Sequence, residues 1–152
     1  MKNIFISTLF LSFTFGQNLN VSEEIVGLWR VKGTSQSYIY QSDGSGIYNI
    51  LLENKKTQYK FSWSIINSNK NNALEPFPTG TLVQDFSQCC GQIYVYNFIY
   101  RSKKTIDPNL IKELNELWIL RNESWNGGDL LILWDANYTY EQASDFTFLE
   151  KY

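Results

Sequence analysis

Hydrophobic and polar residues alternate along several segments of the chain, a period of two that is typical of β-strands burying one face. The two strongest segments are residues 59–65 and 93–101, in which aromatic side chains occupy one face. The aromatic residues of these faces include Tyr59, Phe61, Trp63, Tyr94, Tyr96 and Phe98. Because aromatic residues favour strands, we expect two strands that each bury an aromatic face.

Shorter segments complete the strand pattern. They are residues 28–32, 38–41, 46–52, 81–86, 117–122 and 130–134, with a last short strand at 146–148. Asp43-Gly44 predicts a type I′ hairpin turn, in which both central residues have positive φ. A phosphate-binding loop would need a longer glycine motif with a lysine and a following helix, and a calcium loop would need more oxygen ligands. The Asn126–Asp129 turn predicts a second hairpin, formed by residues 117–122 and 130–134.

Helical signals are few. Residues 22–24 predict one turn of helix at most, and Asp107-Pro108 supplies an N-cap and a first helical residue for a short helix near residues 108–115. Residues 67–72 predict a polar loop. Eight or nine short strands joined by local turns predict an all-β fold, an antiparallel up-and-down meander. Such a meander hides its edges by closing into a barrel or by folding as a sandwich.

The N-terminal residues predict a secretory signal. A lysine precedes an apolar run at residues 4–15, and Thr14 and Gly16 have the small side chains that a signal peptidase site needs. We therefore expect residues 1–16 to be a signal peptide and residues 17–152 a single domain. The run is shorter than the roughly 20 apolar residues that span a membrane, and no later segment is long and apolar enough to span one. The expected location is secreted or periplasmic.

Composition narrows the chemistry. The chain has no histidine, which excludes Ser-His-Asp and Cys-His catalysis and histidine metal sites. Its formal net charge is −2, without a clustered basic face, so no nucleic-acid partner is expected. Acidic residues at positions 43, 85, 129, 135 and 141 lie in or beside predicted turns, where Asp favours backbone hydrogen bonding. A glycosidase instead needs two carboxylates about 5–9.5 Å apart across a cleft. We expect no enzyme, no catalytic residue, no metal and no cofactor.

The two cysteines are adjacent, Cys89 and Cys90. Neighbouring Cα atoms lie about 3.8 Å apart, less than the roughly 4.4–6.8 Å that a disulfide prefers, so a bridge between them would be strained and easily reduced. The first interpretation is two loop thiols, or a strained bridge without function. The alternative is a redox or metal role, although two thiolates alone make a poor zinc site.

Three short motifs near the start of the predicted domain resemble the lipocalin-like domains of secreted bacterial proteins. They are Gly27-Leu28-Trp29, DGSGIY at residues 43–48 and FSWSI at residues 61–65. The match covers mainly residues 25–66, and it implies an up-and-down barrel of about eight strands. Such a barrel is just wide enough for one small ligand or for packed side chains. The resemblance also implies that Trp29 packs across the closed end of the barrel, against a late basic residue, a role that would fall to Arg121.

These observations predict a secreted, non-enzymatic module that binds a small apolar or amphipathic ligand. The candidate ligand-binding residues are the six aromatic side chains of the strongest strands: Tyr59, Phe61, Trp63, Tyr94, Tyr96 and Phe98. The alternative is an extracytoplasmic structural or protein-interaction domain, whose barrel core is filled and binds no ligand. The volume of the cavity inside the barrel separates these two hypotheses.

Overall fold

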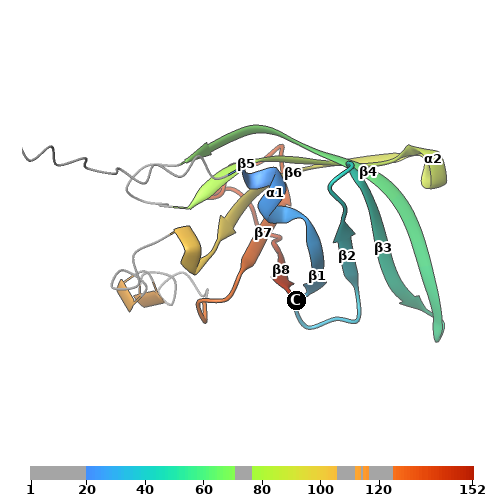
Figure 1. The fold of residues 1–152 in the computed structure, drawn as a ribbon, viewed down its shortest axis with the longest axis horizontal. Coiled ribbons are helices and arrows are strands. Elements are labelled where there is room, and N and C mark those ends of the chain that lie inside the picture. Colours follow the sequence, from blue (N-terminus) through green and yellow to red (C-terminus); the bar gives the residue numbers. More distant parts are fainter. Residues whose placement is uncertain (1–19, 71–76, 106–111, 114, 117–124) are drawn as a thin grey trace, which may run out of the picture.

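The protein folds into a closed barrel of eight antiparallel strands, each paired with the next along the chain and the last with the first (Figure 1). This computed structural model describes residues 20–70, 77–105, 112–113, 115–116 and 125–152. The strands are β1 (Gly27–Val31), β2 (Ser37–Tyr40), β3 (Ser45–Leu52), β4 (Lys55–Lys70), β5 (Pro78–Phe86), β6 (Gln92–Arg101), β7 (Leu130–Asp135) and β8 (Thr147–Lys151). The helical turns are α1 (Val21–Ile25), α2 (Ser87–Cys90) and the 3-10 turn η1 (Lys103–Thr105).

The predicted fold class is confirmed. The all-β meander closes into a barrel rather than a sandwich, and α1 is the single turn of helix expected near residues 22–24. Within the helix expected at 108–115, residues 112–113 and 115 are helical, as is residue 116. Residues 108–111 and 114 lie outside the described part of the chain, as does the expected signal peptide at 1–16.

Successive strands run in opposite directions, so their connections alternate between the two ends of the barrel. The β1–β2, β3–β4, β5–β6 and β7–β8 connections share one end, which we name the open end. The other end carries α1 and the β2–β3 turn, and we name it the closed end. Side chains of α1 pack into the barrel core there: Ile25 is fully buried and Val21 nearly so.

Aromatic side chains fill the barrel interior from the closed end. Trp29, Tyr40, Phe61, Trp63 and Phe98 belong to one buried cluster, together with leucines from β5, β7 and β8. Ring pairs within it meet edge to face, as Trp29 does with Tyr100 at 6.0 Å and Tyr40 with Trp63 at 5.3 Å between centroids. Such pairs contribute about 0.5–1.5 kcal/mol each beyond their buried area.

A second hydrophobic cluster lies on the outer face of β6, β7 and β8. It includes Phe77, Trp125, Ile132 and Trp134, with partly buried side chains from residues 140–148 packed against them. Strand β7 is consequently buried on both faces over five of its six residues. This explains why residues 130–134 form a continuous apolar run instead of an alternating one.

The strands differ in length, and this difference shapes the open end. β1, β2 and β8 have five, four and five residues, whereas β4 and β6 have 16 and 10. In Figure 1, β3, β4 and α2 extend to the right, beyond the shorter strands β1, β2 and β8. The inner faces of the long strands therefore remain uncovered on one side at the open end.

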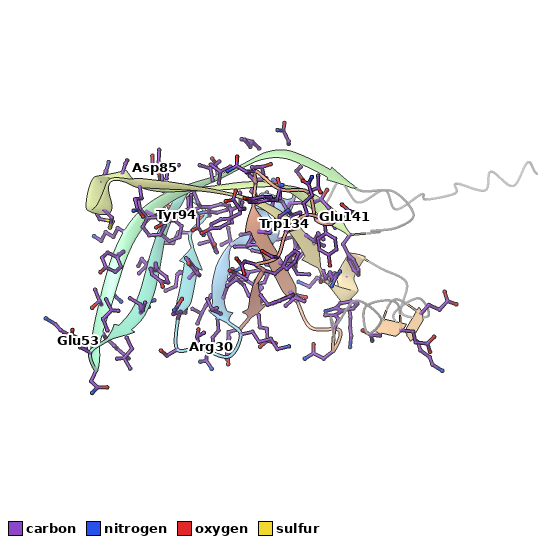
Figure 2. All side chains as sticks on the ribbon, turned by 180° about the vertical axis from the view of Figure 1, so that it is seen from behind. Arg30, Glu53, Asp85, Tyr94, Trp134 and Glu141 are labelled. Carbon is purple, nitrogen blue, oxygen red and sulfur yellow. A yellow bond between two sulfur atoms is a disulfide. The ribbon has the colours of Figure 1, made fainter. Side chains whose placement is uncertain are left out.

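The turn chemistry departs from the prediction at two hairpins. Gly44 has φ +84°, but Asp43 does not share a positive φ, so the β2–β3 turn is not type I′. The Gly44 amide donates to the Gln41 carbonyl at 3.1 Å, which makes a type I turn followed by a left-handed glycine. The two-residue turn with positive φ at both positions is Glu53–Asn54, at the tip of the β3–β4 hairpin. Figure 2 shows Glu53 at this tip.

Two predicted connections are also wrong. Residues 67–70 are not a loop, because β4 continues to Lys70 through an irregularity between Ile66 and Asn69 and pairs with β5 there. Residues 130–134 do not pair with 117–122, because β6 and β8 occupy both edges of β7. Residues 117–122 themselves lie outside the described part of the chain. In both cases pairing with the neighbouring strands of the barrel overrides a local turn signal.

Candidate functional site

The inner faces of the long strands form a pocket of about 470 Å³ at the open end, which we name the mouth pocket. Its lining residues are Tyr38, Tyr48, Tyr59, Gln84, Phe86, Cys90, Gln92, Tyr94 and Tyr96. They come from strands β2 to β6 and from α2. The volume falls within the range of about 300–1,000 Å³ that is typical of small-molecule sites.

A row of three tyrosines forms one wall of the mouth pocket. Tyr38 lies opposite Tyr48 in the β2–β3 register, and Tyr48 lies opposite Tyr59 in the β3–β4 register. Their rings stack along the row, with centroids 4.7 Å apart for Tyr38 and Tyr48 and 6.3 Å apart for Tyr48 and Tyr59. The three rings thus lie roughly parallel to their neighbours along this wall, with Tyr38 and Tyr48 in the closest stack.

The other wall comes from β5 and β6. Tyr94 and Tyr96 are two residues apart on β6 and so lie on the same face of the strand. Their rings are nearly parallel, with centroids 6.1 Å apart. Figure 2 shows Tyr94 on the inner side of the long strands. Phe86 lies between the two walls, because its ring meets Tyr48 edge to face at 6.3 Å and Tyr94 at 5.7 Å. The two walls thus enclose one aromatic space.

The tyrosine hydroxyls of the mouth pocket divide into those with and those without a protein partner. Tyr48 donates to the Gln36 side chain at 2.9 Å, and Tyr94 donates to that of Gln92. Among the described residues, the hydroxyls of Tyr38, Tyr59 and Tyr96 have no hydrogen-bond partner in the protein. A partly buried hydroxyl gains from a hydrogen bond, so these groups are available to water or to a ligand.

Two tyrosines of the mouth pocket have raised pKa values. The pKa of Tyr96 is raised to about 12, mainly by burial, with smaller contributions from Tyr94, Asp135 and Tyr48. Burial also raises the pKa of Tyr38 well above its ordinary value, with contributions from Tyr48, Tyr96 and Tyr94. The hydroxyls of Tyr38 and Tyr96 are therefore neutral at physiological pH.

The six residues predicted to bind a ligand divide into two sets. Tyr59, Tyr94 and Tyr96 line the mouth pocket. Phe61, Trp63 and Phe98 do not line it; they lie deeper in the same barrel, buried in the core cluster beneath the pocket. Trp63 donates from its indole nitrogen to the carbonyls of Gln41 and Ser45, at the closed end.

Six of the nine lining residues were not predicted from the sequence. Tyr38 and Tyr48 lie on β2 and β3, and only the strand register shows that they continue the row begun by Tyr59. Gln84 looks like an outward polar residue, but it is almost fully buried and donates to the Tyr40 hydroxyl at 2.6 Å. The signal that could have found Tyr38 is its alternation with Tyr40 on one face of the same strand.

Trp29 closes the opposite end of the barrel, as the resemblance implied. Its side chain is fully buried, and its indole nitrogen donates to the Ile25 carbonyl of α1 at 2.7 Å. The basic partner is Lys151 of β8, whose Nζ lies 5.5 Å from the Trp29 ring centroid and donates to the Glu24 carbonyl. Arg121 lies outside the described residues. Within the described part of the chain, Lys151 is thus a late basic residue that lies against Trp29.

The two cysteines form a disulfide with each other, with Cα atoms 3.8 Å apart. They end α2, the single helical turn that joins β5 to β6, and Gly91 follows in the left-handed conformation. Asp85 accepts a hydrogen bond from the Ser87 amide at 2.8 Å and so caps the turn. Cys90 lines the mouth pocket, so the disulfide forms part of its rim.

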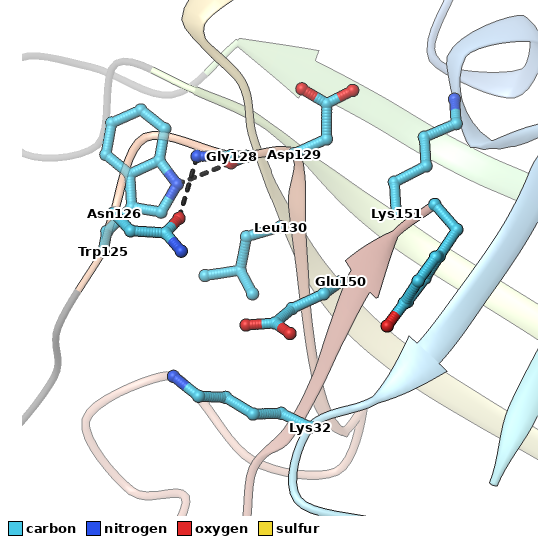
Figure 3. Close-up of a pocket in the computed structure, with 9 residues that line it drawn as sticks. Lys32, Trp125, Asn126, Gly128, Asp129, Leu130, Glu150 and Lys151 are labelled. Atoms are coloured by element: carbon cyan, nitrogen blue, oxygen red, sulfur yellow. Dashed lines mark hydrogen bonds between the residues drawn. The ribbon is translucent and has the colours of Figure 1, made fainter. Parts of the chain in front are cut away.

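A second hollow of about 370 Å³, which we name the side pocket, lies near the closed end (Figure 3). Its lining includes Lys32, Trp125, Asp129, Glu150 and Lys151, with charges of both signs. Several of these groups already have partners: Trp125 donates to the Gly128 carbonyl, and Asp129 accepts from the side chains of Tyr100 and Ser102. More of the polar groups in the side pocket than in the mouth pocket are thus already hydrogen-bonded within the protein.

Three of the five acidic residues near predicted turns accept hydrogen bonds from backbone amides within those turns. Asp43 accepts from the Ser45 amide and hydroxyl, and these hydrogen bonds hold the pKa of its carboxyl below the ordinary value. Asp85 behaves in the same way toward Ser87. Asp135 accepts from the Asn137 amide at 2.8 Å. In the described part of the chain, no three acidic or cysteine side chains come together as a metal site would require.

Comparisons of the chain with models of known protein families, with curated proteins and with solved structures found no match. No helix among the described residues is both long enough and apolar enough to cross a membrane. The barrel and the geometry of its open end are therefore the basis for any assignment of function.

Proposed function

We propose that this protein binds a small amphipathic molecule in the mouth pocket, as a non-enzymatic binding module. The observation that carries the proposal is the set of free hydroxyls on Tyr38, Tyr59 and Tyr96, which face a pocket of about 470 Å³. The rings offer apolar contact area and the hydroxyls offer hydrogen bonds that orient a ligand, which is the usual composition of a small-molecule site. An amphipathic ligand has an apolar part for the rings and a polar part for the hydroxyls.

The wider assignment rests on the sequence motifs together with the barrel. An eight-stranded antiparallel barrel with a buried tryptophan and a lysine at its closed end agrees with the lipocalin-like resemblance. The apolar N-terminal run supports secretion or a periplasmic location. We propose accordingly a secreted lipocalin-like carrier whose ligand enters from the open end.

The alternative, a protein-interaction domain without a ligand, has its own support. The deep part of the barrel is filled by Phe61, Trp63 and Phe98. On the outer face of β6, Ile93 and Val95 are 57% and 42% exposed. Exposed apolar residues of this size are found at protein contacts, but scattered ones are also ordinary on a surface. The mouth pocket is the more specific feature, and we rank the carrier first.

A screen for thermal stabilisation tests the proposal. Neutral, anionic and cationic amphipathic compounds are added to the purified protein, and the unfolding temperature is measured. Binding to the folded state alone raises this temperature with ligand concentration. We expect at least one class to stabilise the protein.

Two matched variants locate the effect. Gln92→Trp fills the mouth pocket from β6, whereas Ile93→Trp adds the same ring to the outer face of the same strand. The expected result is loss of stabilisation in the first variant and its retention in the second. Equal stabilisation in both, or none by any compound in the wild type, would contradict the proposal.

A further inference from the structure

The chemistry of the mouth pocket narrows the class of its ligand; this inference rests on the proposed function. We propose that the pocket takes a neutral, flat ring molecule that carries oxygen substituents, such as a hydroxylated aromatic compound, and that it rejects carboxylates and long alkyl chains. Three features support this class: the charge around the pocket, the way in which its rings are presented, and its depth.

Charge disfavours an anionic ligand. The lining contains no lysine or arginine among the described residues, so no basic group is placed to pair with a carboxylate. Asp135 lies opposite Tyr96 in the β6–β7 register, on the same strand face as Leu131 and Leu133, which pack inside the barrel. Asp135 does not line the mouth pocket, but it is the strand partner of Tyr96, which does. A carboxylate brought near Asp135 would be repelled and would lose water without a counterion.

The presentation of the rings disfavours a cation. Cations bind over ring faces, where the aromatic quadrupole is negative. In the mouth pocket the rings of Tyr38 and Tyr48 stack on each other, as do those of Tyr94 and Tyr96. The faces that Tyr38 and Tyr48 turn toward each other, 4.7 Å apart between centroids, are therefore closed to a cation. Phe86 already meets Tyr48 and Tyr94 edge to face, so a further aromatic ring suits the same walls, and the tyrosine hydroxyls suit its oxygen acceptors.

Depth disfavours a long chain. Phe61 stacks beneath Phe86 with centroids 4.8 Å apart, and Phe98 is fully buried. Tyr40 and Gln84, hydrogen-bonded to each other, are both nearly fully buried below the walls. These residues fill the interior under the pocket, so an extended alkyl chain has no channel to enter. A short, broad ligand fits the space that remains.

A matched set of probes tests this class. Binding of 4′-hydroxyflavone is compared by titration calorimetry with its 4′-carboxylate and 4′-trimethylammonium analogues, and with laurate. The neutral compound should bind at least roughly tenfold more tightly than either charged analogue, because each charge would lose hydration without a partner. Laurate should bind at least as weakly as the charged analogues.

Three variants and one control identify the groups responsible. Tyr59→Phe and Tyr96→Phe each remove one hydroxyl, and each should weaken binding of the neutral probe by roughly fivefold, the usual value of one hydrogen bond. Tyr138→Phe changes an exposed tyrosine outside the pocket and should have no effect. Asp135→Asn should improve binding of the carboxylate analogue by roughly three- to fivefold and leave the neutral probe unchanged.

The outcomes separate this inference from the proposed function. If a charged probe or laurate binds as tightly as the neutral one, the ligand class is wrong, while binding in the mouth pocket stands. A second outcome is that none of the four probes binds, while other compounds stabilise the wild type but not Gln92→Trp. The proposed ligand class is then again wrong, and the proposed function stands. If no compound of any class binds in that way, both fail.

Discussion

At the scale of single residues, Trp29 and Lys151 show how one end of the barrel is closed. Trp29 is fully buried, donates to the α1 backbone, and packs edge to face on Tyr100. Lys151 bridges β8 to α1 through the Glu24 carbonyl, and burial lowers the pKa of its amine. One aromatic side chain and one lysine thus connect the first helix, the first strand and the last strand.

Trp29→Ala should therefore cost about 3–5 kcal/mol in the free energy of unfolding, the range for large aromatic deletions in cores. Urea denaturation measures this change. Tyr138→Ala, at an exposed position, is the control and should cost far less. A loss below about 1 kcal/mol for Trp29→Ala would contradict a structural role for the closed end.

At the scale of elements, the β2–β3 turn depends on one glycine. Gly44 has φ +84°, a region that β-branched residues resist, and its carbonyl accepts from the Trp63 amide at 2.8 Å. Gly44→Val should destabilise the protein by about 1–3 kcal/mol. Ser42→Val, in the same turn but without a positive φ, is the control and should change stability little. Equal losses in the two variants would show that backbone conformation is not the cause.

The disulfide of α2 has a different expected effect. It joins adjacent residues, so it closes almost no loop and restricts the unfolded chain very little. Both cysteines are exposed. Replacing both by serine should change the free energy of unfolding by less than about 1 kcal/mol. A loss above about 2 kcal/mol would mean that α2 depends on the bridge.

At the scale of the whole molecule, alternation in the sequence predicted the barrel and three of the nine residues that line the mouth pocket. The aromatic faces of β4 and β6 turn inward as expected, because a period of two survives folding wherever one face is buried. Alternation cannot tell which inward residues lie at the open end and which lie on the floor. Tyr59 lines the pocket and Phe61 does not, because Phe61 is covered by Tyr40 and Phe86, whose ring centroids lie 5.7 and 4.8 Å from its own. Which residues cover which depends on how the other strands of the barrel are placed, and one strand's own alternation does not contain that information.

Alkaline pH tests the buried tyrosines of the whole barrel. Tyrosine in an unfolded chain ionises near pH 10, whereas the pKa of Tyr96 in the fold is about 12. The fold favours the protonated form, so this stabilisation is fully present below pH 10 and is lost as pH rises toward 12. The free energy of unfolding should fall over this interval, less steeply in Tyr96→Phe than in the wild type. Tyr138→Phe is the control. An equal slope in Tyr96→Phe and in the wild type would contradict burial of the Tyr96 hydroxyl.

The central claim is that the mouth pocket binds a small molecule, and nuclear magnetic resonance of the tyrosine side chains tests it most directly. The protein is labelled with ¹³C at the tyrosine ring carbons and titrated with 4′-hydroxyflavone and with stabilising compounds from the screen. We expect saturable chemical-shift changes at Tyr38, Tyr59 and Tyr96, while the signals of Tyr138 and Tyr152 stay unchanged. Saturable shifts confined to other tyrosines, or no shifts with any compound, would contradict it.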